Sequence, residues 1–273
     1  MAKPALGFGT APILGRIDRR SSLAALGWAY DRGVRHFDTA RSYGWGDAEG
    51  LLGDFLRERG DSEAFVVTKC GILPPKKSNA LGTLKTAAQK VVRQVPALRP
   101  LARRVGHSGA FALTYSYDLA KLASSVETSL RELKRPIDVL LLHSYNASRP
   151  GIAEVADWMQ RLVQSGDVRA FGFSIGDDLQ AGITHLDAEG LLGSAWVQAP
   201  MSDDVLALAS YWKTTPLMVH SPFSYLRSSA DRQSSGLAGI YRDLTAMGGC
   251  CAVVCSMFSR SHIDDNIEAV SAA

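Results

Sequence analysis

The chain has 273 residues, 46% of them hydrophobic, and a formal net charge of +3. This length suffices for one large core, so we expect a single domain over residues 1–273, because α/β barrels of roughly 250 residues fold as one unit. The small net charge gives no reason to expect a nucleic-acid partner.

The sequence also lacks the apolar segments that membrane insertion or export requires. No uninterrupted apolar run approaches the roughly 20 residues that span a bilayer, and the start, MAKPALGFGTAP, lacks a signal peptide's long apolar core. We therefore expect a soluble, cytoplasmic protein with no membrane partner. Two of the four cysteines are adjacent and the other two lie in apolar runs, which indicates reduced thiols rather than disulfides or a metal site.

Short apolar runs rich in Val, Ile and Phe alternate with longer stretches of helical period, which is typical of repeated βα units and a parallel sheet. Strands are expected over residues 6–12, 36–40, 64–71, 137–144, 168–175, 194–200, 216–224 and 251–258. Helices are expected over residues 21–33, 48–60, 116–136, 152–166, 178–191, 205–214, 236–249 and 261–273. Eight units favour a (β/α)8 TIM barrel. The alternative is an open Rossmann sheet, but no GxGxxG motif opens a helix.

Capping residues suggest where some of these helices begin and end. Ser21 or Ser22 can cap the first helix. Gly60 is suited to end the second helix in a left-handed conformation. Ser261, with Asp264 three residues later, resembles a capping box at the start of the last helix.

Three successive expected strands each end on one ionisable residue. The apolar run of the second strand ends in Asp38, that of the third in Lys69 and that of the fourth in His143, and Tyr43 follows Asp38 after a short turn. Each residue alone has an ordinary explanation: a carboxylate that bonds loop amides, a solvated rim lysine, a core histidine or a packing tyrosine. Together they are expected at the carboxyl ends of the strands, where barrels of this kind build their active sites.

In this order and spacing, Asp38, Tyr43, Lys69 and His143 resemble the catalytic residues of the aldo-keto reductases, and the resemblance covers nearly the whole chain. It implies a (β/α)8 barrel enzyme that uses NADP(H) or NAD(H) to interconvert an aldehyde or ketone and its alcohol. The implied partner is a small-molecule carbonyl or alcohol. The length, the start and the interrupted third loop look most like the shorter bacterial branch that handles sugars and small aldehydes.

The chemistry of carbonyl reduction explains why these residue types occur together. A tyrosine with a pKa near 10 gives up its proton reluctantly at pH 7. The Lys69 ammonium is expected to lower the pKa of Tyr43, and Asp38 to keep that ammonium charged and aimed. His143 can orient the substrate oxygen and stabilise charge that develops on it. Trp45 is either a wall of the pocket or an aromatic residue that covers the barrel.

The resemblance also implies contacts to the nicotinamide, which match the family only in part. Ser174 and Gln198 stand where the family binds the nicotinamide amide, but Ile175 replaces the usual Asn. His220 stands where an aromatic residue usually stacks on the nicotinamide ring.

At the adenosine end, Asp265 and Asn266 match the acid and the amide that hold the adenine in the family. Ser256 and His262 occupy the places of the basic residues that usually bind the 2′-phosphate. Weak discrimination between NADP(H) and NAD(H) is therefore expected. Arg260 is a candidate substitute for the missing charges, or else a solvated surface arginine.

The segment after the third strand is strongly basic. No Asp or Glu occurs from Ile72 to Tyr117, whereas lysines and arginines recur between Lys76 and Arg104. A loop after a barrel strand lies over the carboxyl face, so this long basic loop is expected to form a lid or a collar on the pocket. A solvated excursion is the alternative.

Two other functions are open to such a barrel. In an aldolase-type enzyme Lys69 would form a Schiff base, but that chemistry needs a depressed lysine pKa and a paired Asp38 raises it. A dinucleotide-binding regulatory subunit without turnover is the second alternative. The altered Ile175 and His220 leave that alternative open, whereas the intact catalytic residues argue against it.

Overall fold

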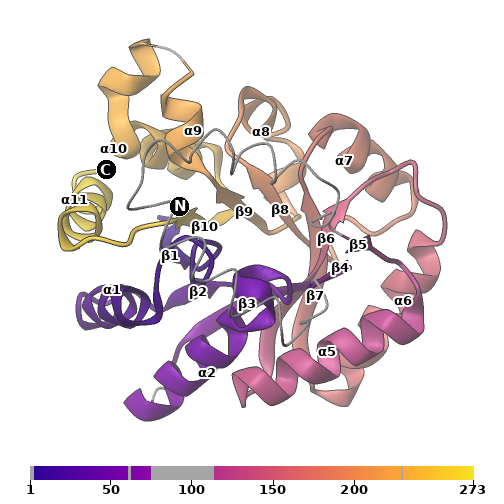
Figure 1. Cartoon of the computed structure of the whole chain (residues 1–273). Coiled ribbons are helices and arrows are strands. Elements are labelled where there is room, and N and C mark those ends of the chain that lie inside the picture. The colour runs from indigo at the N-terminus through magenta and orange to yellow at the C-terminus, as the bar shows by residue number, and fades with distance from the viewer. Residues whose placement is uncertain (1–2, 61–62, 75–113, 229) are drawn as a thin grey trace, which may run out of the picture.

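The computed structural model describes residues 3–60, 63–74, 114–228 and 230–273. Within them, eight parallel strands close into a barrel in the order β1-β10-β9-β8-β7-β6-β3-β2 (Figure 1). The strands are β1 (Ala5–Gly9), β2 (His36–Asp38), β3 (Phe65–Cys70), β6 (Ile137–Tyr145), β7 (Val168–Ile175), β8 (Trp196–Pro200), β9 (Leu217–His220) and β10 (Cys250–Cys255). β1 completes the ring by pairing with both β2 and β10. The predicted (β/α)8 barrel is confirmed, rather than an open Rossmann sheet.

Helices follow the strands and surround the barrel (Figure 1). They are α1 (Arg19–Asp31), α2 (Ala48–Arg59), α5 (Leu119–Leu133), α6 (Ile152–Ser165), α7 (Leu179–Ala188), α8 (Asp203–Ala207), α9 (Pro222–Leu226), α10 (Ala230–Met247) and α11 (Arg260–Ser271), with the 3-10 helices η1 (Tyr43–Gly46) and η4 (Tyr211–Lys213). None of these helices, in the part of the chain that the structure describes, is long and apolar enough to cross a membrane.

A separate two-stranded antiparallel sheet follows β3 in the chain. It pairs β4 (Ile72–Leu73) with β5 (Thr114–Tyr115). The basic loop that the sequence predicts over the pocket, from Lys76 to Arg104, lies outside the described residues.

The strands are apolar along their length because both of their faces are buried. In β6, Val139 and Leu141 belong to a small core inside the barrel. Leu140 and Leu142 belong to the larger core between the strands and the helices. Side chains of a strand alternate between its two faces, so one strand contributes to both cores. Because both faces of each strand are packed, the strand ends are held in place, and these ends carry Asp38, Lys69 and His143.

Two helix starts differ from the sequence-based expectation. α1 is capped by Asp18, whose carboxylate accepts hydrogen bonds from the amide and the hydroxyl of Ser21, so Ser21 and Ser22 lie inside the helix. α11 is capped by Ser259 rather than by Ser261. In both helices an earlier side-chain oxygen already satisfies one of the free amides of the first turn, so the later serine is not needed as a cap.

Other element boundaries follow from proline and glycine chemistry. The strand expected over residues 216–224 ends at His220, and α9 begins at Pro222. Proline cannot donate a ladder hydrogen bond and suits the first turn of a helix. The helix expected over residues 205–214 is divided into α8 and η4. α2 ends as predicted at Gly60, which takes the left-handed conformation with φ 63°.

Candidate active site

The side chain of Lys69 connects the ends of β2 and β3. Its Nζ donates hydrogen bonds to both carboxylate oxygens of Asp38, at 2.7 and 2.8 Å, and to the carbonyl oxygen of Thr39 at 2.9 Å. The two strands are paired neighbours. Lys69 is 2% exposed and Asp38 is 4% exposed. The two residues therefore form a buried ion pair that charge-assisted hydrogen bonds hold in one geometry.

Tyr43 lies in the turn after β2, beside the same ammonium. The Nζ of Lys69 lies 5.1 Å from the centroid of the Tyr43 ring. The turn forms because Gly44 and Gly46 adopt positive φ values of 57° and 90°. Trp45 between them also has a positive φ, and its side chain is 37% exposed and does not line the cavity described below.

Burial controls the acidity of Tyr43. It raises the pKa of Tyr43, while Lys69 acts in the opposite direction and lowers it. The net direction is opposite to the sequence-based expectation, because a buried phenolate loses more hydration energy than an ammonium already paired with Asp38 restores. Burial also disfavours the charged form of Lys69, but Asp38 and Tyr43 raise the pKa of Lys69, so the ammonium stays charged.

His143, near the end of β6, meets Tyr43 edge to face. The two ring centroids are 5.9 Å apart and the ring planes make an angle of 82°. Burial, together with the charge of Lys69, lowers the pKa of His143 to about 3. Its Nδ1 has no hydrogen-bond partner among the described residues. His143 is therefore a neutral imidazole at pH 7, able to donate to or accept from a substrate oxygen.

One cavity of about 900 Å³ joins these residues at the carboxyl ends of the strands. The cavity is lined by Asp38, Tyr43, Lys69 and His143. All but one of the residues that the sequence assigns to the cofactor also line it, namely Ser174, Gln198, His220, Asp265 and Asn266. The volume lies in the range typical of small-molecule and cofactor sites. Within the described ranges, no group of three or more His, Cys, Asp or Glu side chains is placed to hold a metal ion.

Ser174 and Gln198 form a chain of hydrogen bonds that ends at the Asp38 carboxylate. Ser174 Oγ donates to Gln198 Oε1 at 3.2 Å, and Gln198 Nε2 donates to Asp38 Oδ2 at 2.6 Å. Ile175, which stands in place of the family's Asn, is buried in the outer core. The two residues expected to bind the nicotinamide amide therefore lie next to the Asp38–Lys69 pair.

His220 lies at the end of β9 and presents a polar ring to the cavity. Its Nδ1 lies 2.9 Å from the hydroxyl of Ser221. Burial, together with the charge of Lys69, lowers the pKa of His220 to about 4. The residue is therefore neutral at pH 7, and its ring is available at the position where the family usually places an aromatic residue.

Of the expected adenosine contacts, Asp265 and Asn266 reach the cavity and Arg260 does not. The guanidinium of Arg260 stacks over the ring of Trp28 on α1, 4.4 Å from its centroid. The indole of Trp28 in turn donates to Asp264 at 3.1 Å. Arg260 is thus part of the contact between α1 and α11.

Sequence reasoning missed two cations of the cavity. Arg16, after β1, and Arg227, after α9, line the cavity together with Ser256 and His262. Arg227 Nη2 donates to the hydroxyl of Ser224 at 3.2 Å. No motif marks either arginine. The available signal was position alone, because each lies in a segment that follows a barrel strand, β1 or β9, on the catalytic side.

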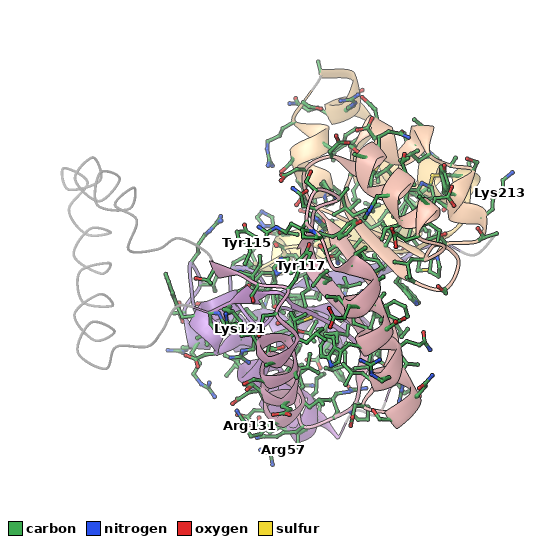
Figure 2. All side chains as sticks on the ribbon, turned by 90° about the vertical axis from the view of Figure 1, so that its right-hand side faces the viewer. Arg57, Tyr115, Tyr117, Lys121, Arg131 and Lys213 are labelled. Atoms are coloured by element: carbon green, nitrogen blue, oxygen red, sulfur yellow. The ribbon has the colours of Figure 1, made fainter. Side chains whose placement is uncertain are left out.

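Tyr115, in β5, and Tyr117, just after it, lie near each other (Figure 2). The guanidinium of Arg149, in the loop after β6, lies 5.0 and 5.4 Å from their ring centroids. The backbone amide of Asn146 also donates to the Tyr117 hydroxyl at 3.3 Å. These contacts connect the chain after β5 to the loop that follows His143.

Comparison of the sequence with known proteins points to one family. The sequence profile of the Aldo/keto reductase family matches residues 5–202. Pyridoxal 4-dehydrogenase of Microbacterium luteolum is 28% identical over 188 residues, which cover 63% of this chain and 52% of that protein. D-threo-aldose 1-dehydrogenase of a Pseudomonas species is 40% identical over 91 residues, 30% of this chain and 27% of that protein. The matches thus span about half the length of these curated relatives, or less.

Comparison of the structure agrees with the sequence match. An aldo/keto reductase from Klebsiella pneumoniae, solved in complex with NADP and acetate, superposes with a TM-score of 0.62 at 20% sequence identity. The superposition covers 98% of this chain and 86% of that chain. At this level of identity the likeness is one of fold, and it extends beyond residue 202 to the last βα units.

Proposed function

Because the chain belongs to the aldo/keto reductase family, we propose that it uses NADP(H) or NAD(H) to interconvert an aldehyde or ketone and its alcohol. One observation carries the proposal. The Lys69 ammonium lies between the Asp38 carboxylate and the Tyr43 phenol, with His143 against that phenol, in a single cavity. This arrangement suits proton transfer to an oxygen that gains negative charge.

The four side chains divide the work of the reaction among them. When bound, the dinucleotide supplies the hydride for the carbonyl carbon. Tyr43 donates its phenolic proton to the carbonyl oxygen, and Lys69 stabilises the phenolate that remains. His143 holds the same oxygen by a hydrogen bond, and Asp38 keeps Lys69 charged and in place. In the oxidation direction the Tyr43 phenolate takes the proton of the alcohol.

The lining of the cavity fits a dinucleotide. The Ser174 hydroxyl and the Gln198 side-chain amide offer donors and acceptors for a carboxamide such as that of nicotinamide. Asp265 and Asn266 would hold the adenosine end. Arg16 supplies positive charge for phosphate groups, and so does Arg227, which also lines the cavity. These assignments make both NADP(H) and NAD(H) acceptable cofactors.

The substrate in this proposal is a sugar or another small polar carbonyl compound. His143 and His220 both face the cavity as neutral imidazoles and can bind hydroxyl groups near a carbonyl. Two relatives in the family are named for an aldose and for pyridoxal.

The proposal also includes a single domain, because the elements of one barrel run from β1 to α11. A cytoplasmic location is proposed as well, and the four free cysteines accord with a reducing compartment.

The test is oxidation of NADPH and of NADH by the purified chain in the presence of aldoses, pyridoxal and small aliphatic aldehydes. Binding of each cofactor is followed in parallel by fluorescence. Turnover of at least one carbonyl is expected. Binding without turnover of any carbonyl in either direction would instead indicate a regulatory subunit, and no binding of either cofactor would remove the basis of the proposal. Trapping of a carbonyl compound on Lys69 by borohydride would indicate an aldolase, which the raised pKa of Lys69 disfavours.

A further inference from the structure

A buried carboxylate lies behind the catalytic residues, between the turn that carries Tyr43 and the strand that carries Lys69. It belongs to Glu49, in the first turn of α2, and Glu49 is 1% exposed. Glu49 does not line the cavity, so it cannot touch a substrate or a cofactor there. Any part that it plays in the reaction must act through its neighbours.

The first neighbour is Arg41, which hydrogen-bonds the turn that carries Tyr43. Its guanidinium donates to Glu49 Oε2 and to the backbone carbonyl oxygen of Gly46. A Cβ atom at Gly46 would lie 2.7 Å from Arg41 Nη2. Glycine is therefore needed at position 46 both for its φ of 90° and for the space that the guanidinium occupies.

The second neighbour is Thr68, on β3. Its Oγ1 donates to Glu49 Oε1 at 2.6 Å. Thr68 immediately precedes Lys69, and side chains alternate along a strand, so Thr68 points outward to the helices while Lys69 points into the barrel. The backbone amide of Arg41 also donates to the carbonyl oxygen of Lys69 at 3.2 Å.

The helices on this side of the barrel enclose the network. α2 and α5 lie side by side outside β3 (Figure 1), and Ser129 of α5 is among the groups that lower the pKa of Glu49 against the opposing effect of burial. Arg41, Thr68 and Ser129 are all buried. A buried charge of this kind is stable only when its partners are all in place, so the network permits one relative position of the turn and the strand.

We infer that Glu49 is a positioning residue that, through Arg41 and Thr68, sets the distance between the Tyr43 phenol and the Lys69 ammonium. The inference rests on the proposed function, because that distance matters for proton transfer by Tyr43. A displacement of about 1 Å at a reacting group can cost on the order of 10²-fold in rate. Glu49 therefore acts on the chemical step and leaves the binding of substrate and cofactor largely unchanged.

The test compares two variants of the network with a matched control. Glu49→Gln removes the charge at constant shape, and Thr68→Val removes one hydrogen bond at nearly constant volume. Asp138→Asn is the control, because Asp138 is also a buried carboxylate, bonded to Arg169 at 2.6 Å and to the Val66 amide at 2.7 Å, and does not line the cavity.

Both network variants should lower kcat by roughly 10- to 100-fold, with KM for the carbonyl and Kd for NADPH within a few fold of the wild-type values. Asp138→Asn should lose stability and keep kcat within a few fold. An equal loss of kcat in all three variants would show a general effect of stability and would overturn the inference. If Glu49→Gln does not fold, Thr68→Val against Asp138→Asn decides the same question.

A second readout does not depend on turnover. The chain is labelled with tyrosine carrying ¹³C at Cζ, and the Tyr43 resonance is assigned by its loss in Tyr43→Phe. The resonance should move in Glu49→Gln and in Thr68→Val and stay in place in Asp138→Asn. An unmoved resonance in both network variants overturns the inference. If the wild-type chain reduces no carbonyl, the proposed function fails, and the resonance still decides whether Glu49 positions Tyr43.

Discussion

Gln198 donates a hydrogen bond of 2.6 Å to Asp38, across the barrel from the end of β8 to the end of β2. The Oδ2 atom that accepts it also accepts from Lys69 at 2.8 Å. Asp38 is thus held from two directions while it holds Lys69, and the ammonium in turn contacts Tyr43. The ion pair therefore has two separable effects, one on the stability of the chain and one on the reactivity of the phenol.

Replacing Lys69 by methionine should reveal both effects. Lys69→Met leaves the Asp38 carboxylate buried without a counter-charge, which is expected to lower the free energy of unfolding by about 3–5 kcal/mol. The double variant Lys69→Met with Asp38→Asn removes that charge, so it should recover most of the stability and none of the turnover. Urea unfolding and NADPH oxidation measure the two quantities. A double variant as unstable as the single one would refute the assignment of the cost to the unpaired carboxylate.

Stability should fall in mild acid because three buried histidines resist protonation. Burial and Lys69 lower the pKa of His143 to about 3 and that of His220 to about 4, and burial also lowers the pKa of His36 to about 4. Unfolded histidines protonate near pH 6.5, so below that pH the unfolded chain binds more protons than the folded one. The free energy of unfolding should therefore be highest above pH 6.5. It should fall by about 1.4 kcal/mol per pH unit per histidine toward pH 4.

His36 tests this pH dependence without disturbing the cavity lining. It stacks on Phe65, with ring centroids 5.1 Å apart, and its Nε2 has no hydrogen-bond partner among the described residues. His36→Phe keeps an aromatic ring in that place. Between pH 6.5 and 5 the free energy of unfolding should then change less steeply with pH. The slope should decrease by about 1.4 kcal/mol per pH unit, which is the contribution of one histidine. Urea unfolding at several pH values measures the slope, and a slope identical to that of the wild type would contradict the pKa assigned to His36.

Discrimination between the two cofactors should be weak. Ser256 and His262 line the cavity where the family usually has basic residues, and Arg260 is stacked on Trp28. A 2′-phosphate then lacks dedicated cations, so the ratio of kcat/KM for NADPH and NADH should stay below about 1,000-fold, or roughly 4 kcal/mol. Ser256→Lys should raise the preference for NADPH. A wild-type preference above that limit would point to Arg227 or another cation of the cavity, and Arg227→Ala would then be expected to abolish it.

Much of the barrel could be predicted because strand burial leaves a direct trace in sequence. The strand expected over residues 168–175 coincides with β7, and that over residues 137–144 is one residue shorter than β6. Both consist mainly of apolar residues, and most of their residues are buried. Asp38, Lys69 and His143 were identifiable because each interrupts an apolar run where the strand reaches the catalytic face.

What could not be predicted depends on contacts between distant parts of the chain. Arg260 turns toward Trp28, which lies far away in sequence, and no local pattern signals that choice. The net effect on the pKa of Tyr43 depends on how burial compares with the charge of Lys69, which spacing alone does not tell. Arg16 and Arg227 reach the cavity through loops that carry no motif.

The most direct test of the account is turnover and cofactor binding by Tyr43→Phe. The phenol is assigned to proton transfer alone, and loss of a general acid typically costs about 10² to 10⁴ in rate. The variant should therefore lose nearly all NADPH oxidation with any carbonyl that the wild-type chain reduces, while its Kd for NADPH, read by fluorescence, stays within a few fold. Turnover close to that of the wild type would contradict the assignment of Tyr43, and with it the mechanism built on Asp38, Lys69 and His143.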